Sequence, residues 1–203
     1  MITQGRYPAY MSVAEPIQQK GIDGADLAKR WLESTTWIEL PFDAYHNAPI
    51  CQLTRLDGKK KLYDLFGCIY GSPKTPLYIE SKGYDSVGGK QAKEYWEFLA
   101  NAYSITAQDL KDGLDARREF WWITRMPFSS TDWADLTTAE RMKTALEAHH
   151  PEALADNEIN VDTLAIAAAR VEVFVVNRRQ EDFMLTPQEL ALVESTLNRK
   201  GMR

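Results

Sequence analysis

Apolar residues recur at helical spacing along several parts of the chain. Residues 23–37 carry one such stripe, which predicts a helix that begins near Asp23. Its apolar positions are Leu27, Ala28, Trp31 and Leu32. The same spacing predicts helices over residues 90–104, 137–150 and 186–201, and a short Ala-rich helix before residue 171. The residues before Asp23 include two prolines and are expected to be irregular.

Shorter apolar runs predict five strands. They cover residues 50–56, 60–70, 76–82, 119–128 and 171–176. Asp57 and Gly58 form a strong two-residue turn signal between the first two runs, and residues 71–75 (GSPKT) form the turn before the third. Residues 41–49 contain two prolines and are predicted as a loop. Three consecutive antiparallel strands between residues 50 and 82 are therefore the simplest interpretation.

The order of these elements predicts an α/β fold in which helices flank a mixed central sheet. A length of 203 residues suits one domain. We expect an irregular lead over residues 1–22 and a single domain over residues 23–203. Within that domain, residues 23–126 would form the core and residues 127–203 a helix-strand-helix extension.

The composition is that of an ordinary soluble protein, with 44% hydrophobic and 26% charged residues. A net charge of −5 argues against a surface that binds nucleic acid all over, but it allows a local basic path. The apolar runs fall short of the ~20 residues that span a bilayer, and the first residues lack the layout of a secretory signal. We therefore expect a cytoplasmic protein with no membrane partner.

Cysteine and lysine usage adds little chemistry. Cys51 and Cys68 stand in apolar surroundings and form no Cys-x-x-Cys pair, so free buried thiols are predicted rather than a zinc site or disulfide. Lys59, Lys60 and Lys61 form a basic run, and such a run is most often a solvated face.

A strand that looks buried ends in the charged segment Glu80, Ser81 and Lys82. Side chains alternate along a strand, so Glu80 and Lys82 share one face. Opposite charges at the edge of a core cost desolvation energy unless something binds there, which marks the pair as a candidate site. Pairing across the turn at residues 71–75 brings Asp64 within one or two residues of the position opposite Lys82.

These side chains supply what metal-dependent phosphodiester hydrolysis needs. Carboxylates must hold the ion, and a positive group must lie near the attacking water or the phosphate. Asp64, Glu80 and the backbone carbonyl of Ser81 would hold Mg²⁺ weakly, or Mn²⁺ as a substitute, because magnesium accepts few protein ligands and several waters. Lys82 would orient a water, stabilise hydroxide or neutralise charge that develops on the phosphate.

Asp64 in LYDLFG, the YIESK strand and the helix that begins with Lys90 and Gln91 together resemble the PD-(D/E)xK nuclease superfamily, which has the restriction-endonuclease-like fold. In that superfamily a helix precedes a meander of strands, the Asp lies in the second strand, the ExK lies in the third, and a further helix follows. The resemblance covers residues 23–126. Tyr63 stands where the name motif has proline.

The resemblance implies a role for each matching residue. Asp64 and Glu80 would bind the metal, Lys82 would serve the nucleophilic water, and Gln91 would be an accessory residue of the active site. Members often carry a supporting Glu on the leading helix, and Glu33 is the nearest fit here.

Other residues around this core have less specific signals. Asp26 is a second choice after Glu33 for the supporting acid of the leading helix. Lys90 and Lys93 are candidates for phosphate contacts, with a solvated helix face as the alternative. Trp121 and Trp122 stand in a continuous apolar strand and are predicted to be core and rim residues rather than a base-stacking platform.

The sequence thus favours a metal-dependent nuclease, with DNA as the implied nucleic acid and restriction, defence or repair as the implied context. It would act alone, as a homodimer or as a subunit beside a partner protein. The alternative is a non-catalytic module of nuclease-like fold that binds protein or nucleic acid. A purely structural ion-pair face also stays open. GxSxG, P-loop and GxGxxG signatures are absent from the sequence, which disfavours serine hydrolases and nucleotide-driven enzymes.

Overall fold

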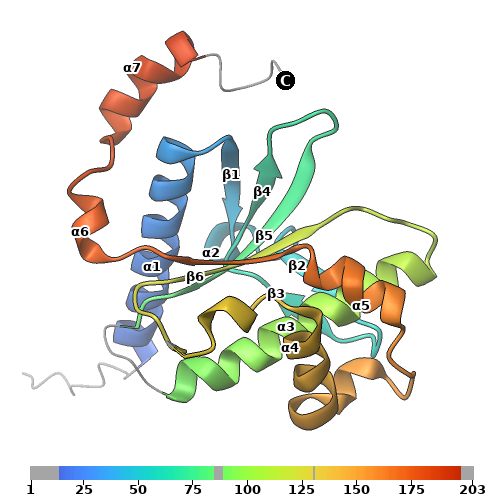
Figure 1. Ribbon diagram of the computed structural model, residues 1–203. Coiled ribbons are helices and arrows are strands. Elements are labelled where there is room, and N and C mark those ends of the chain that lie inside the picture. The colour runs from blue at the N-terminus through green and yellow to red at the C-terminus, as the bar shows by residue number, and fades with distance from the viewer. Residues whose placement is uncertain (1–13, 85–88, 130, 198–203) are drawn as a thin grey trace, which may run out of the picture.

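The computed structural model describes residues 14–84, 89–129 and 131–197 and has a five-stranded sheet at its centre (Figure 1). In spatial order its strands are β1 (Ile38–Asp43), β4 (Leu65–Ile69), β5 (Thr75–Lys82), β6 (Glu119–Thr124) and β7 (Val171–Val175). β1, β4 and β5 are antiparallel neighbours, whereas β6 and β7 run parallel to β5. The expected mixed central sheet is confirmed.

Helices cover both faces of this sheet (Figure 1). The helical segments are α1 (Ala14–Thr35), α2 (Ala44–Asn47), α3 (Gly89–Lys111), η1 (Trp133–Asp135), α4 (Ala139–Thr144), η2 (Ala145–His149), η3 (Pro151–Leu154), α5 (Val161–Ala168), α6 (Arg178–Glu181) and α7 (Pro187–Leu197). On one face, Leu27 and Leu32 of α1 form a buried cluster with Leu77 and Ile79 of β5. On the other face, residues of α3, α4 and α5 form the larger core cluster.

The alternation of β5 and β6 decides which side chains meet which helix. Tyr78 and Trp122 belong to the cluster under α3, whereas Ile79 and Trp121 belong to the cluster under α1. Both tryptophans are therefore core residues, where the sequence predicted core and rim. Because side chains on one face recur every second residue, the charged end of β5 presents its even-numbered residues toward α3.

The first strand of the sheet lies where the sequence predicted a loop from Pro41 onward. β1 accommodates Pro41 because it is an edge strand, where the missing N–H need not pair with a neighbour. A bulge between Glu39 and Phe42 interrupts its pairing with β4. Gly67 of β4 faces this bulge, and a Cβ there would stand 1.9 Å from the carbonyl oxygen of Glu39, so only glycine fits.

The predicted strand at residues 50–56 does not join the central sheet. Its ordered part, β2 (Gln52–Thr54), pairs with β3 (Lys60–Leu62) in a separate two-stranded hairpin. The turn is confirmed, with Gly58 at a φ of +75°. The meander in the central sheet is therefore β1, β4 and β5, and the hairpin is an insertion between its first two strands.

The first two long helices extend beyond their predicted ends. α1 begins at Ala14, so the expectation of an irregular lead is wrong for residues 14–22, while residues 1–13 lie outside the described residues. α3 continues to Lys111, past the predicted end at residue 104. The polar residues in its last turns follow a continuously buried stretch, residues 98–106, which already anchors the helix.

The C-terminal extension contributes to the same sheet, because β7 is its fifth strand. Thr138 caps α4 by accepting a hydrogen bond from the Arg141 N–H at 3.2 Å, and Thr186 accepts one from the Glu189 N–H at 3.2 Å. Pro187 is the first residue of α7, and the predicted helix end at Gly201 lies outside the described residues.

Both cysteines are free, as predicted, with Cys51 buried and Cys68 half-buried. Among the helices of the described residues, none combines the length and the apolar character that crossing a bilayer requires.

Candidate active site

Asp64 reaches β5 just where the pairing between β4 and β5 ends. The last backbone pair of the two strands is Leu65 with Ile79. One position further, the Ser81 N–H donates a hydrogen bond to Oδ2 of Asp64 at 2.7 Å. The register places Asp64 opposite Glu80, which is within the range predicted from the turn. A hydrogen bond to the Asp64 side chain thus takes the place of the next backbone hydrogen bond between the two strands, and it joins Asp64 to the charged end of β5.

Glu80 lies buried between two lysines. Its Oε1 accepts a hydrogen bond from Nζ of Lys82 at 2.8 Å, and its Oε2 lies 2.9 Å from Nζ of Lys61. Burial by itself would raise the pKa of Glu80, but the ammonium groups of Lys61 and Lys82 outweigh it and hold the pKa below its ordinary value. Glu80 is therefore ionised at neutral pH.

Lys82 is held in its protonated form. Its Nζ also lies 3.3 Å from Oε2 of Glu94 on α3 and 5.3 Å from the centre of the Trp122 ring. Burial opposes the charge, but Glu80, and then Asp64 and Glu94, raise the pKa of Lys82 above its ordinary value. A lysine in this state supplies a positive charge rather than a general base.

These surroundings disfavour the ionised form of Asp64. Burial, followed by the charge of Glu80, raises the pKa of Asp64 to about 7. The Ser81 N–H and the two lysines act in the opposite direction without outweighing these causes. Two carboxylates that repel each other in this way favour a proton or a cation between them.

Gln91 lies beside the charged end of β5. Its side chain is buried, and Nε2 donates a hydrogen bond to Oγ1 of Thr124 at 2.5 Å. Thr124 ends β6 and is the parallel partner of Lys82. Within the part of the chain that the structure describes, Oε1 of Gln91 has no hydrogen-bond partner.

Glu33 lies outside this cluster. Its Oε1 accepts a hydrogen bond from the Leu40 N–H at 2.9 Å and so ties α1 to β1. The part of α1 next to the site is Gly24, which lies against Ser81 and Gly83. Glu33 follows Gly24 by nine residues, which is about 13 Å along a helix axis.

Asp26 and the site both act on Tyr45, which no sequence motif marks as a site residue. Burial, followed by the charges of Asp64, Asp43 and Asp26, raises the pKa of Tyr45. The Tyr45 hydroxyl therefore lies in the field of both Asp64 and Asp26. Asp26 also lines a charged cleft of about 560 Å³ with Asp23, Lys29, Arg30, Arg125 and Glu181.

Lys90 and Lys93 are exposed on the first turns of α3, the end of the helix that carries Gln91. Nζ of Lys90 lies 3.8 Å from Oε1 of Glu94. Lys93 lines a cavity of about 520 Å³ together with Trp96 and with His149, whose ring stacks on Trp96 at 4.5 Å. The two lysines thus offer positive charge to solvent next to the buried cluster.

Lys61 is the site residue that sequence reasoning missed. It belongs to the basic run that was predicted to be a solvated face, and Lys60 and Leu62 on either side are indeed exposed. The side chain of Lys61, by contrast, is 18% exposed. Its spacing of two residues from the buried Tyr63 is the signal that could have placed Lys61 on the inner face.

The residues present fit a hard divalent cation held by a few protein oxygens and water. In the described ranges, no three side chains of Asp, Glu, His or Cys gather closely enough to hold a metal ion. Asp64 and Glu80 nevertheless repel each other, and a cation would relieve that repulsion. Magnesium accepts such a small set of protein ligands because it retains several of its waters.

No family model and no curated protein matches the chain. Among solved structures, it is similar to the Acinetobacter baumannii Cap4 SAVED/CARF-domain containing receptor with the cyclic trinucleotide 2′3′3′-cAAA, with 12% identity, a TM-score of 0.37, and coverage of 89% of this chain and 35% of that one. It is also similar to the Moraxella osloensis Cap4 receptor, with 12% identity, a TM-score of 0.36, and coverage of 91% and 38%. The chain spans little more than a third of these receptors, and likeness at this level assigns it neither a function nor a ligand.

Proposed function

We propose that the protein is a metal-dependent nuclease that hydrolyses phosphodiester bonds. The observation that carries this proposal is the hydrogen bond of 2.7 Å from the Ser81 N–H to Asp64. It brings a carboxylate from the second strand of the meander to the strand that ends in Glu80 and Lys82. The chain order of helix, three-strand meander, helix and strand also supports the proposal, since the PD-(D/E)xK enzymes that the sequence resembles share that order.

The metal-binding residues would be Asp64, Glu80 and the backbone carbonyl of Ser81, with Mg²⁺ or Mn²⁺ as the ion. When bound, such a cation polarises the phosphate and makes a bound water more acidic. Asp64 has to be ionised to act as a ligand. Because its pKa is about 7, Asp64 becomes available as the pH rises through neutrality.

Lys82 would neutralise the negative charge that develops on the phosphate. It is protonated and fixed beside Glu80, so it offers a positive charge that needs no reorganisation during the reaction. Attack of water on phosphorus forms one P–O bond and breaks another, and the released alkoxide takes up a proton. The buried Oε1 of Gln91 would accept a hydrogen bond from a water or a substrate hydroxyl.

DNA is the proposed substrate, in restriction, defence or repair. The exposed Lys90 and Lys93 would contact phosphates next to the cleaved bond, because backbone phosphates attract lysine irrespective of base sequence. With a net charge of −5, the surface as a whole does not attract nucleic acid. We therefore propose that a second copy or a partner subunit contributes to DNA binding.

A second candidate function is binding of a nucleotide or nucleic acid, or of a protein, without cleavage. The observation that favours it is that both oxygens of Glu80 are already neutralised, by Lys61 and by Lys82. A structural ion-pair cluster has the same arrangement. The two candidates differ in whether a cation can bind Glu80 in competition with Lys61 and Lys82.

The test is incubation of the purified protein with plasmid, linear duplex, single-stranded DNA and RNA in Mg²⁺, Mn²⁺ or EDTA, beside the Lys82→Ala variant. We expect cleavage that requires the metal and is lost in the variant. Cleavage that survives Lys82→Ala unchanged would refute the assigned site. Absence of cleavage together with binding of nucleic acid or of a cyclic trinucleotide in EDTA would favour the second candidate.

A further inference from the structure

The β2–β3 hairpin brings a second lysine into the candidate site. Lys61 is the middle residue of β3 and pairs with Leu53 of β2. Its Nζ lies 2.9 Å from Oε2 of Glu80, and its side chain is largely buried. Lys60, the preceding residue on the same strand, faces the other way and is exposed. The inner face of the hairpin thus serves the site, although the hairpin is not part of the central sheet.

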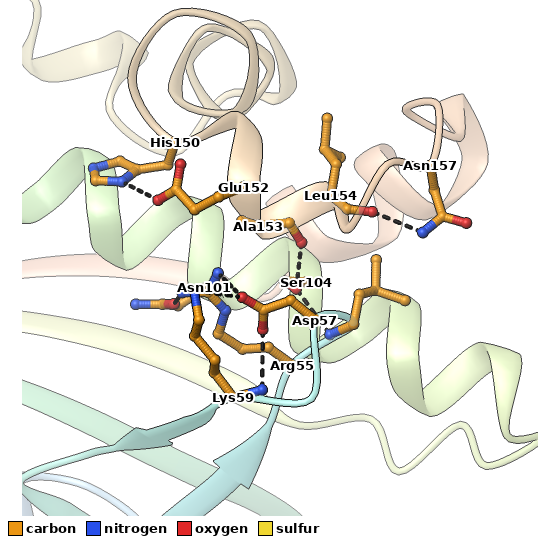
Figure 2. Close-up of polar contacts among 11 residues, drawn as sticks. Arg55, Asp57, Lys59, Asn101, Ser104, His150, Glu152, Ala153, Leu154 and Asn157 are labelled. Atoms are coloured by element: carbon orange, nitrogen blue, oxygen red, sulfur yellow. Dashed lines mark hydrogen bonds and ion pairs between the residues drawn. The ribbon is translucent and has the colours of Figure 1, made fainter.

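A polar network at the far end of the hairpin fixes its position (Figure 2). Nη1 of Arg55 donates a hydrogen bond to Oδ1 of Asn101 on α3 at 2.9 Å. The Leu56 N–H donates to Oγ of Ser104 at 3.0 Å, and that hydroxyl donates to the carbonyl of Ala153 at 2.6 Å. Because Asn101 and Ser104 are buried, these bonds hold the hairpin to α3 and define where Lys61 meets Glu80.

The two lysines on Glu80 are held differently. Lys82 lies on the central strand β5 and also contacts Glu94 at 3.3 Å. Among the described residues, Glu80 is the one carboxylate within ion-pair distance of Lys61. A cation on Glu80 would repel both ammonium groups. Lys61, with fewer carboxylate contacts and a flexible four-carbon side chain, is then the lysine that can turn to another anion.

We propose that Lys61 is a substrate-binding lysine of this site, an inference that rests on the proposed nuclease function. In the free protein Lys61 neutralises Glu80. When a divalent cation shares Glu80, Lys61 contacts a phosphate oxygen of the nucleic acid. Lys61 therefore competes with the cation for Glu80 and strengthens substrate binding, whereas Lys82 acts on the reacting phosphate.

The test compares Lys61→Gln with Lys60→Gln, a matched control on the opposite face of the same strand, and with Lys61→Arg. For Lys61→Gln we expect Mn²⁺ to bind up to about tenfold more tightly in calorimetry, because a competing charge is gone. In cleavage assays its KM for nucleic acid should rise about tenfold, with kcat within about threefold of wild type. Lys61→Arg should restore KM, and Lys60→Gln should change neither quantity.

Each outcome separates this inference from the proposed function. If wild type binds Mn²⁺ and cleaves while Lys61→Gln behaves like Lys60→Gln, the role of Lys61 is refuted and the nuclease function stands. A loss of thermal stability in Lys61→Gln with unchanged Mn²⁺ affinity and KM would show a merely structural lysine and would refute it as well. If wild type neither binds Mn²⁺ nor cleaves, the proposed function fails and this inference falls with it.

Discussion

Asp57 and Asp64 flank strand β3 and are both half-buried, yet their surroundings shift the carboxyl pKa in opposite directions. Around Asp57, burial is outweighed by the Lys59 N–H and then by Arg55, so the pKa of Asp57 lies below its ordinary value. Around Asp64, burial and Glu80 prevail and the pKa rises to about 7. The ionised carboxylate of Asp57 therefore stabilises the folded state, whereas that of Asp64 destabilises it.

The comparison shows that buried ion pairs alone do not mark a functional site. Both regions combine carboxylates with basic side chains at hydrogen-bond distance, as Figure 2 shows for Asp57. What differs is the effect of burial and the charges that answer it: burial is the largest cause of the raised pKa of Asp64, and the charge of Glu80 adds to it, whereas around Asp57 the Lys59 N–H and Arg55 outweigh burial. A carboxylate that its neighbours keep partly protonated near neutral pH can gain stability from a bound cation, which is the property expected of a site.

The largest expected effect is on cleavage. Asp64→Asn removes one of the two carboxylates proposed to hold the metal, so the rate of phosphodiester cleavage should fall by about 10³-fold or more. Asp57→Asn, the same change on the other side of β3, should stay within about threefold of wild type. Initial rates on one DNA substrate in Mg²⁺ check both. An equal loss in the two variants would mean that the rate follows stability rather than the site.

A smaller effect is expected on the pH dependence of stability. Because the pKa of Asp64 rises from 3.8 to about 7 on folding, the folded protein holds more protons than the unfolded protein between these values. The contribution of Asp64 to the free energy of unfolding therefore falls as the pH rises through this window. Asp64→Asn should match wild type near about pH 4 and be more stable by ~4 kcal/mol at about pH 8, measured by urea unfolding.

The control for this pH effect is Asp57→Asn, which should show the opposite sign. The pKa of Asp57 is lowered on folding, so its ionised form contributes stability above 3.8 that is lost as the pH falls through its folded value. The variant should be less stable than wild type at neutral pH and approach it in acid. The same sign for both variants would contradict the contrast drawn between the two aspartates.

The next effect in size concerns the anchor of the hairpin. Arg55→Met leaves Asn101 and Asp57 without their guanidinium partner, so the free energy of unfolding should fall by about 2–3 kcal/mol. Lys59→Gln is the matched change at a side chain that is 67% exposed, and it should cost less than about 0.5 kcal/mol. Urea unfolding of the two variants measures the difference. Similar values would mean that the network does not hold the hairpin.

The smallest effect concerns the leading helix. Glu33→Ala removes the acceptor of the Leu40 N–H, which should cost about 1 kcal/mol of stability and leave kcat/KM for cleavage unchanged. If Glu33→Ala stays folded but does not cleave, Glu33 is the supporting acid after all.

Asp26→Asn should lower kcat/KM a few-fold, because the charge of Asp26 acts on Tyr45 together with that of Asp64. The change should have little effect on stability, because Asp26 is exposed.

Local patterns in the sequence predicted which charged side chains gather at the end of β5. The alternation in YIESK placed Glu80 and Lys82 on one face, and the turn at residues 71–75 limited the position of Asp64 on the neighbouring strand. The amphipathic stripe after residue 89 predicted the helix that carries Gln91, whereas Gln91 itself was selected through the resemblance to the nuclease superfamily. These features depend on spacing within one hairpin or one helix, which the sequence contains directly.

Features that depend on which elements meet were harder to predict. Pro41 favoured a loop, because the sequence does not show that β1 is an edge strand that tolerates proline. Residues 50–56 have a strand pattern, but the pattern does not tell whether the partner is the central sheet or a separate hairpin. The spacing from Tyr63 could have placed Lys61 on the inner face of the hairpin, but its contact with Glu80 follows from where that hairpin docks on α3.

Calorimetric titration of Mn²⁺ into wild type, Asp64→Asn and Asp57→Asn at about pH 8 tests the central claim most directly, because it asks whether the Asp64 and Glu80 pair holds a cation. We predict that wild type and Asp57→Asn bind the ion alike and that Asp64→Asn binds it at least about tenfold more weakly. Absence of Mn²⁺ binding to wild type, or equal binding by Asp64→Asn, would contradict the account.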